Sequence, residues 1–206
     1  MLLIRLITSF LFFALAAFAE ETLEDAARLA RNLVGGSSMG TLATSYPSNH
    51  TSLAGQPFAL MEYYAPCYAN GSLAILFFYI SLNSHNILGS PDHSATITVQ
   101  APPSKSPAAS PRVALIGNVT LLDNDEDKEL ESCYLERHPD SKWWVPGGKG
   151  EFHGVTWARF DPHTVYYVGG FGRIHYIGYI PLSLYQASGG DPKPAKPLYF
   201  DQSRLY

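Results

Sequence analysis

The stretch VGGFGRIHYIGYI, residues 168–180, combines four glycines with a run of β-branched and aromatic residues. A dinucleotide-binding loop needs a third glycine at a fixed spacing and a helix immediately after it. Here Gly170-Phe171-Gly172 lacks that third glycine, and Ile174, Tyr176 and the following residues favour a strand. The stretch therefore predicts a strand, a glycine turn and a second strand, and it excludes a Rossmann phosphate loop.

The rest of the chain predicts further strands framed by two helices. Alternation of apolar and polar residues predicts strands over 94–100 and 112–122. Strands are also predicted over 155–160 and 164–168, joined by a turn at 161–163, and over 57–65 and 73–80, joined as a hairpin through Asn70-Gly71. Helices are predicted over 21–34 and 123–136. The fold class is mainly β with peripheral helices, in the form of a small barrel.

The N-terminus has the pattern of a secretory signal. Arg5 precedes a largely apolar run, and small residues at 17–19 provide a cleavage site before Glu20. The alternative is a membrane anchor, but the run is shorter than the ~20 residues that a spanning helix needs. Residues 1–19 are therefore interpreted as a signal peptide, 20–186 as one domain, and 187–206 as a tail rich in proline and glycine.

Sequons, cysteines and charge agree with an extracellular protein. Asn49, Asn70 and Asn118 each begin an N-glycosylation pattern. Cys67 and Cys133 are the only cysteines, so a single disulfide is predicted, with two buried thiols as the alternative. The formal net charge of −4 argues against a nucleic-acid partner.

Two patterns of chemical interest are rejected on context. Gly36-Ser37-Ser38-Met39-Gly40 matches the nucleophile elbow of hydrolases, but that elbow requires a strand before the serine and a helix after it. Here a predicted helix precedes Ser38 and an apparent strand follows it. The seven histidines form none of the paired motifs that bind a metal, so no metal site is predicted.

Taken together, these segments resemble secreted glycoproteins of the CREG type (the "cellular repressor" family). That family belongs to the pyridoxamine 5′-phosphate oxidase-like superfamily of FMN-binding split barrels. The resemblance is carried by GSSMGTLAT (36–44), GQPFALMEYY (55–64), LFFYISLNSHNILGSPDHSATITV (76–99), RVALIGNVTLL (112–122), YLERHPDSKWW (134–144) and FHGVTWARFDPHTVYYVGGFGRIHYI (152–177). It implies a split β-barrel fold and a homodimer.

The resemblance also indicates where a flavin would bind. In flavin-binding members, basic residues on the strand resembling 57–64 and on the turn resembling 81–86 hold the FMN phosphate. This chain has no lysine or arginine between Arg31 and Lys105. The polar candidates that remain are Ser81, Ser84 and Asn86, with Arg173 or Lys149 as basic groups from elsewhere. Without the charge-assisted contacts the flavin site is expected to be reduced or lost.

Three functions follow from this resemblance. The first is a secreted protein that acts by binding, with a protein partner outside the cell and no cofactor. The second is an FMN-dependent oxidoreductase that uses the polar candidates. The third is a haem-binding barrel with His175 as a ligand, because related haem-utilisation proteins share a similar glycine turn. The missing basic residues favour the first.

Overall fold

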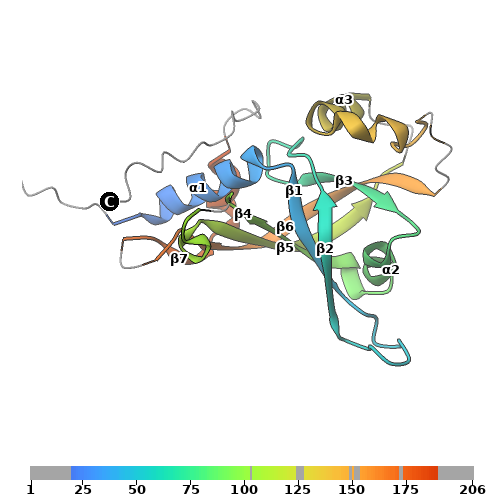
Figure 1. Cartoon of the computed structure of the whole chain (residues 1–206), viewed down its shortest axis with the longest axis horizontal. Helices are drawn as coiled ribbons and strands as arrows, with labels where there is room; N and C mark the ends of the chain where they lie inside the picture. The colour runs from blue at the N-terminus through green and yellow to red at the C-terminus, as the bar shows by residue number, and fades with distance from the viewer. Residues whose placement is uncertain are drawn as a thin grey trace, which may run out of the picture.

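A computed structural model describes residues 20–102, 104–123, 128–148, 150, 154–171 and 174–189 (Figure 1). The elements, in chain order, are α1 (Leu23–Gly36), β1 (Met39–Ser45), β2 (Pro57–Tyr63), β3 (Leu73–Phe78), α2 (Leu82–Leu88), η1 (Pro91–His93), β4 (Ser94–Gln100), η2 (Pro107–Ala109), β5 (Arg112–Leu121), α3 (Lys128–Arg137), η3 (Pro139–Trp143), β6 (Val155–Val168), β7 (Ile177–Ile180) and α4 (Leu182–Ala187). The predicted signal peptide and residues 190–206 of the predicted tail lie outside the described residues. None of the described helices is long and apolar enough to cross a membrane.

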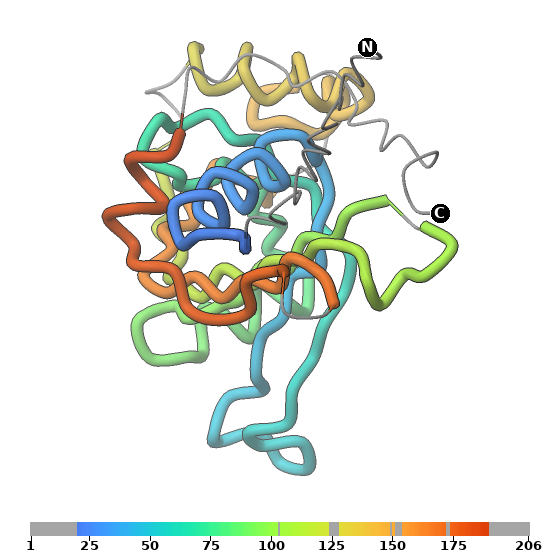
Figure 2. Tube along the Cα trace, turned by 90° about the vertical axis from the view of Figure 1, so that its left-hand side faces the viewer, coloured from blue at the N-terminus to red at the C-terminus, as the bar shows by residue number. Residues whose placement is uncertain are grey.

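The strands form one antiparallel sheet of seven, in the order β2-β1-β4-β5-β6-β3, with β7 paired to β6. Val168 of β6 lies opposite Ile177 of β7, so the predicted strand, glycine turn and strand at 168–180 are confirmed. The β1–β2 hairpin is long, and Figure 2 shows it projecting from the body of the molecule. Its loop, residues 46–56, carries the exposed Asn49.

Two apolar clusters lie on either side of the sheet. The larger one fills the barrel and includes the buried face of α1, whose residues Ala26, Ala30 and Val34 are fully buried. Helix α1 begins at Leu23 and is capped by Thr22, whose hydroxyl accepts a hydrogen bond from the Asp25 amide in a capping box. The second cluster lies under α3 and η3 and contains Ala65, Ala74, Leu76, Leu130, Tyr134, Val145, Val155 and Trp157.

The predicted hairpin between 57–65 and 73–80 is wrong. Strand β2 pairs with β1, whereas β3 pairs with β6, and the two segments meet only in an isolated bridge between Ala65 and Ala74. The Asn70-Gly71 turn does form, with Gly71 at φ +89°. A turn determines only the local direction of the chain, and here β3, buried along most of its length, pairs across the barrel with β6 instead.

The predicted break at 161–163 is also wrong, because β6 runs unbroken from Val155 to Val168. The register against β5 shifts between Ile116 and Gly117, where Gly117 lies opposite Pro162. Such an irregularity allows a proline inside a strand, because the ladder there does not require its missing N–H. The helix predicted over 123–136 is described from Lys128, and residues 124–127 lie outside the described residues.

Candidate functional site

The three polar residues predicted to hold a flavin phosphate lie at helix α2. The resemblance implied a turn over 81–86, but the segment is helical from Leu82, with Ser81 as the residue preceding it. Ser84 and Asn86 are buried, with 5% and 1% of their surfaces exposed. Whether these residues contact a cofactor remains a prediction.

A buried hydrogen-bond network already uses part of this helix. The Asn86 amide Nδ2 donates to Thr44 Oγ1 at 3.1 Å, and Thr44 Oγ1 donates to Asn83 Oδ1 at 3.1 Å. Thr44 belongs to β1, so the network attaches α2 to the sheet. Buried polar groups that are paired in this way stabilise the fold, and breaking the pairs would be costly.

The basic residues give no support to a phosphate site at α2. Arg31 is the last cation before Lys105 in the sequence, and only 9% of it is exposed. Its guanidinium donates to the Ala69 carbonyl at 2.8 Å and lies 5.1 Å from the centre of the Tyr185 ring. The charge is therefore used inside the fold, while Arg173 and Lys149 lie outside the described residues.

The glycine turn is fastened to the start of the domain by His175. The imidazole Nδ1 donates to Glu21 Oε2 at 3.1 Å, and the Glu21 amide donates to the Ile174 carbonyl at 2.9 Å. A Cβ on Gly169 would lie 2.7 Å from Glu21 Oε2, and one on Gly170 would lie 2.7 Å from His175 Cδ2, so a larger residue at either position would displace this pair. Nδ1 is thus engaged by a carboxylate while Nε2 has no described hydrogen-bond partner.

A cluster of ionisable side chains that the sequence analysis missed lies between β2 and the end of α3. The Tyr63 ring stacks on the His138 ring with centroids 4.3 Å apart, and the Tyr63 hydroxyl donates to Asp140 Oδ2 at 3.1 Å. Tyr134 completes the aromatic contacts, with its ring 4.8 Å from that of His138. No local spacing could have revealed this cluster, because Tyr63 and His138 are far apart in the sequence.

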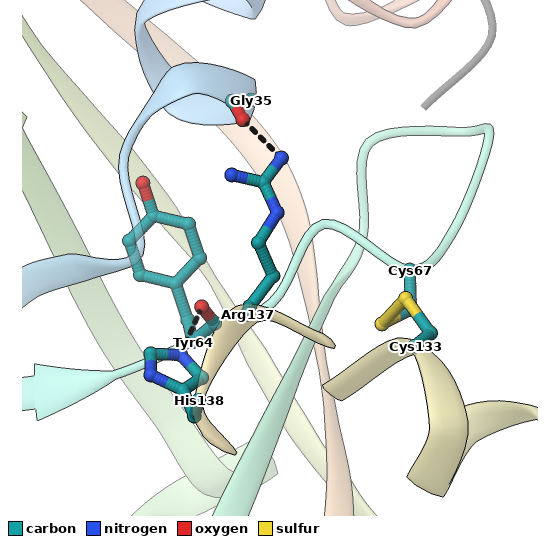
Figure 3. The surroundings of a disulfide bond; sticks show 6 residues. All are labelled: Gly35, Tyr64, Cys67, Cys133, Arg137 and His138. Carbon is teal, nitrogen blue, oxygen red and sulfur yellow. Dashed lines mark hydrogen bonds between the residues drawn. A yellow bond between two sulfur atoms is a disulfide. The ribbon is translucent and has the colours of Figure 1, made fainter. Parts of the chain in front are cut away.

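The same region attaches α3 to the barrel, as Figure 3 shows. The predicted disulfide between Cys67 and Cys133 is confirmed. Arg137 donates to the Gly35 carbonyl at 2.6 Å, where a cation is favoured at the C-terminus of α1. His138 Nε2 donates to the Tyr64 carbonyl at 2.9 Å.

Burial shifts the pKa values of His138 and of Glu62, which precedes Tyr63 on β2, in opposite directions. It raises the pKa of Glu62 to about 7, and it lowers the pKa of His138 from its ordinary value. The Asp140 carboxylate raises the pKa of Tyr63 through their hydrogen bond. Perturbed carboxyl and imidazole groups can mark functional sites, although structural networks also produce them.

The described residues contain no group of three or more His, Cys, Asp or Glu side chains that could hold a metal ion. Ser38 lies between helix α1 and strand β1, the reverse of the order that a hydrolase elbow requires. Within the described residues, chemically perturbed or oriented groups occur at the His175–Glu21 pair and in the Glu62–His138 region.

Comparison with known proteins identifies the architecture. A family model described as "CREG, beta-barrel" matches residues 21–187. The chloroplastic haem oxygenase HOZ of Arabidopsis thaliana is 28% identical over 183 residues, which are 85% of this chain and 52% of the relative. The chain thus spans about half the length of that relative.

Two solved structures show the same fold at low sequence identity. A haem-binding protein from Mycobacterium smegmatis superposes with a TM-score of 0.64 and 23% identity, covering 79% of this chain and 60% of the other. A protein of unknown function from Agrobacterium tumefaciens superposes with a TM-score of 0.58 and 19% identity, covering 72% and 58%. These similarities confirm the predicted split barrel.

Proposed function

The chain belongs to the CREG β-barrel family, and from this premise we propose that it is a secreted, glycosylated protein that acts by binding and has lost the flavin site. The proposal includes removal of residues 1–19, a protein partner outside the cell, and glycans on Asn49, Asn70 and Asn118. The sequons at Asn49 and Asn70 support it, because both side chains are exposed.

One observation carries the loss of the flavin site. The polar groups of α2 are buried, Asn83 and Asn86 are bonded to Thr44, and the last preceding cation, Arg31, is engaged with Ala69 and Tyr185. A phosphate bound through Asn83 or Asn86 would have to break their bonds to Thr44, and it would gain no charge-assisted bond from any residue between Arg31 and Lys105. Because hydrogen bonds would be lost and no charge-assisted bond gained, FMN binding is disfavoured, and so is the oxidoreductase alternative.

Flavin titration tests this proposal. When excess protein is added to FMN, the flavin fluorescence is expected to stay unchanged, and the protein purified without added cofactor is expected to show no visible flavin absorption. Unfolded protein is the control for non-specific quenching. Saturable quenching that weakens in the Ser81→Ala, Ser84→Ala double variant would restore the oxidoreductase.

Haem binding is a second candidate, favoured by the His175–Glu21 pair. Histidines that ligate a metal usually donate the other ring N–H to a carboxylate, as His175 donates Nδ1–H to Glu21. The similarity to HOZ, whose name records a haem enzyme, adds support. A haem bound there would supply a redox-active iron, and His175 Nε2 would be its ligand.

The haem candidate predicts a spectroscopic change. Adding haemin should give a Soret band shifted from that of free haemin. The shift should be lost in His175→Ala and kept in His163→Ala, because His163 is an exposed histidine whose Nδ1 bonds to its neighbour Thr164. A spectrum that equals that of free haemin would eliminate this candidate and leave the binding protein.

We also propose that the secreted binding protein is a homodimer. Met39 and Met61 lie on the same face of the β1–β2 hairpin, with 52% and 61% of their surfaces accessible, and they offer apolar area for a second copy. Sedimentation should give the mass of two chains, and Met61→Glu should shift it toward one. A single-chain mass for the unaltered protein would remove the dimer.

A further inference from the structure

An open hollow lies between η1 and the end of β5. Ser90, Asp92 and His93 line one side, and the run from Asn118 to Leu121 lines the other. Its volume is about 780 Å³, within the roughly 300–1,000 Å³ that small-molecule sites occupy. The hollow is therefore large enough for one or two sugar rings.

The wall at η1 is held in an unusual backbone conformation. Asp92 and His93 have φ values of +55° and +51°, and they are the only non-glycine residues with positive φ in the described part of the chain. Such residues are costly and persist only where their surroundings hold them. Two hydrogen bonds do so: the Ser94 amide donates to Ser90 Oγ, and the Ser94 hydroxyl donates to the Pro91 carbonyl, both at 2.9 Å.

His93 presents a hydrogen-bond acceptor at the hollow. Its Nδ1 lies 3.2 Å from the Val119 carbonyl, and a carbonyl can only accept, so Nδ1 carries the proton. In the neutral ring Nε2 is then an acceptor, and no described residue bonds to it. The exposed carboxylate of Asp92 is a second acceptor at the rim.

Asn118 belongs to this hollow and to a sequon at once. Its Nδ2 donates to the Asp92 carbonyl at 2.6 Å. A primary amide has two N–H groups, so one can hold this bond while the other carries a substituent. Thr120, the third sequon residue, is exposed. Asn49 and Asn70 differ, because both lie exposed in loops outside the hollow.

We propose that this hollow seats the first sugars of an N-glycan on Asn118, a proposal that rests on the secretion and glycosylation proposed above. In the transfer, a lipid-linked oligosaccharide diphosphate donates its sugar: the sugar C1–Nδ2 bond forms, the C1–phosphate bond breaks, the lipid diphosphate leaves and the amide loses one proton. The ligand class is the N-acetylglucosamine core, whose hydroxyl and acetamido N–H groups pair with the acceptors on His93 and Asp92.

The rate at which an enzyme releases the glycan tests whether the hollow binds its first sugars. The secreted protein is treated in its native state with a peptide-N-glycosidase, and each sequon is followed by mass spectrometry. Release at Asn118 is expected to be roughly tenfold slower than at Asn49 and Asn70, because the seated sugar must first leave the hollow. After denaturation the three rates should become equal.

A histidine variant distinguishes binding of the sugars in the hollow from general steric hindrance around Asn118. His93→Ala should accelerate release at Asn118 alone, whereas the control His163→Ala should change none of the three rates. Absence of glycan from all three sequons would overturn the glycosylation proposed above. Two results would overturn only the binding of the glycan in the hollow. One is glycan on Asn49 and Asn70 with Asn118 unmodified. The other is native release at Asn118 that is as fast as release at Asn49 and Asn70.

Discussion

Replacing Cys67 with serine is expected to lower the free energy of unfolding by about 4 kcal/mol, the entropic value for opening a loop of this size. The Cys67–Cys133 disulfide closes a loop with a sequence separation of 66 and joins the segment between β2 and β3 to α3. Chemical denaturation of the oxidised protein and of the variant measures the difference.

The variant should still fold, because two further contacts hold α3. Arg137 donates to the Gly35 carbonyl, and His138 donates to the Tyr64 carbonyl, and neither bond involves a cysteine. The Cys67→Ser, Cys133→Ser double variant is the matched control, since it removes the bridge without leaving a free thiol. A loss below about 1 kcal/mol in both variants would contradict the prediction, because it would show that the bridge constrains the unfolded chain little.

Replacing Glu62 with glutamine is expected to stabilise the protein more at pH 8 than at pH 4.5. Burial raises the pKa of Glu62 from 4.5 to about 7. A raised carboxyl pKa favours the folded state below the unfolded value of 4.5, and this stability is lost as the pH rises through about 7. Glutamine does not titrate. The free energy of unfolding of the variant, relative to that of the unaltered protein, should therefore rise by about 1–3 kcal/mol from pH 4.5 to pH 8.

Comparing the variant with the unaltered protein at each pH separates the effect of Glu62 on stability from that of His138. The pKa of His138 is lowered by burial, so its contribution has the opposite sign and is lost as the pH falls below the unfolded value of 6.5. Since His138 is present in both proteins, its effect cancels in the difference. The exposed Glu136→Gln on α3 is the control, and a Glu62→Gln difference no larger than that of Glu136→Gln would contradict the assignment.

The elements that the sequence predicted well are those with strong local patterns. Alternation of apolar and polar residues predicted the strand from Ser94 to Gln100 at its observed bounds. The helical spacing of Ala26, Ala30 and Val34 predicted α1, and the cysteine count predicted the bridge. Two errors arose where local and long-range preferences disagree: Asn70-Gly71 suggested a hairpin, and Pro162 suggested a break.

The candidate sites were less accessible to sequence reasoning. His175 was singled out, but its carboxylate partner Glu21 comes from the other end of the domain. No local pattern indicates the cluster of Tyr63, His138 and Asp140. The sequon marked Asn118, but nothing in the sequence indicated that it lies against Asp92 and His93.

The sequence by itself determined the mainly β class, the cysteine pair, the sequons and the absence of cations between Arg31 and Lys105, since these depend on neighbouring residues or on composition. Only the tertiary structure decided that β3 pairs with β6, that Asn86 is buried against Thr44, and that the carboxyl of Glu62 has a raised pKa. Strand pairing and burial depend on contacts between distant residues, whose free energy no local window of sequence contains.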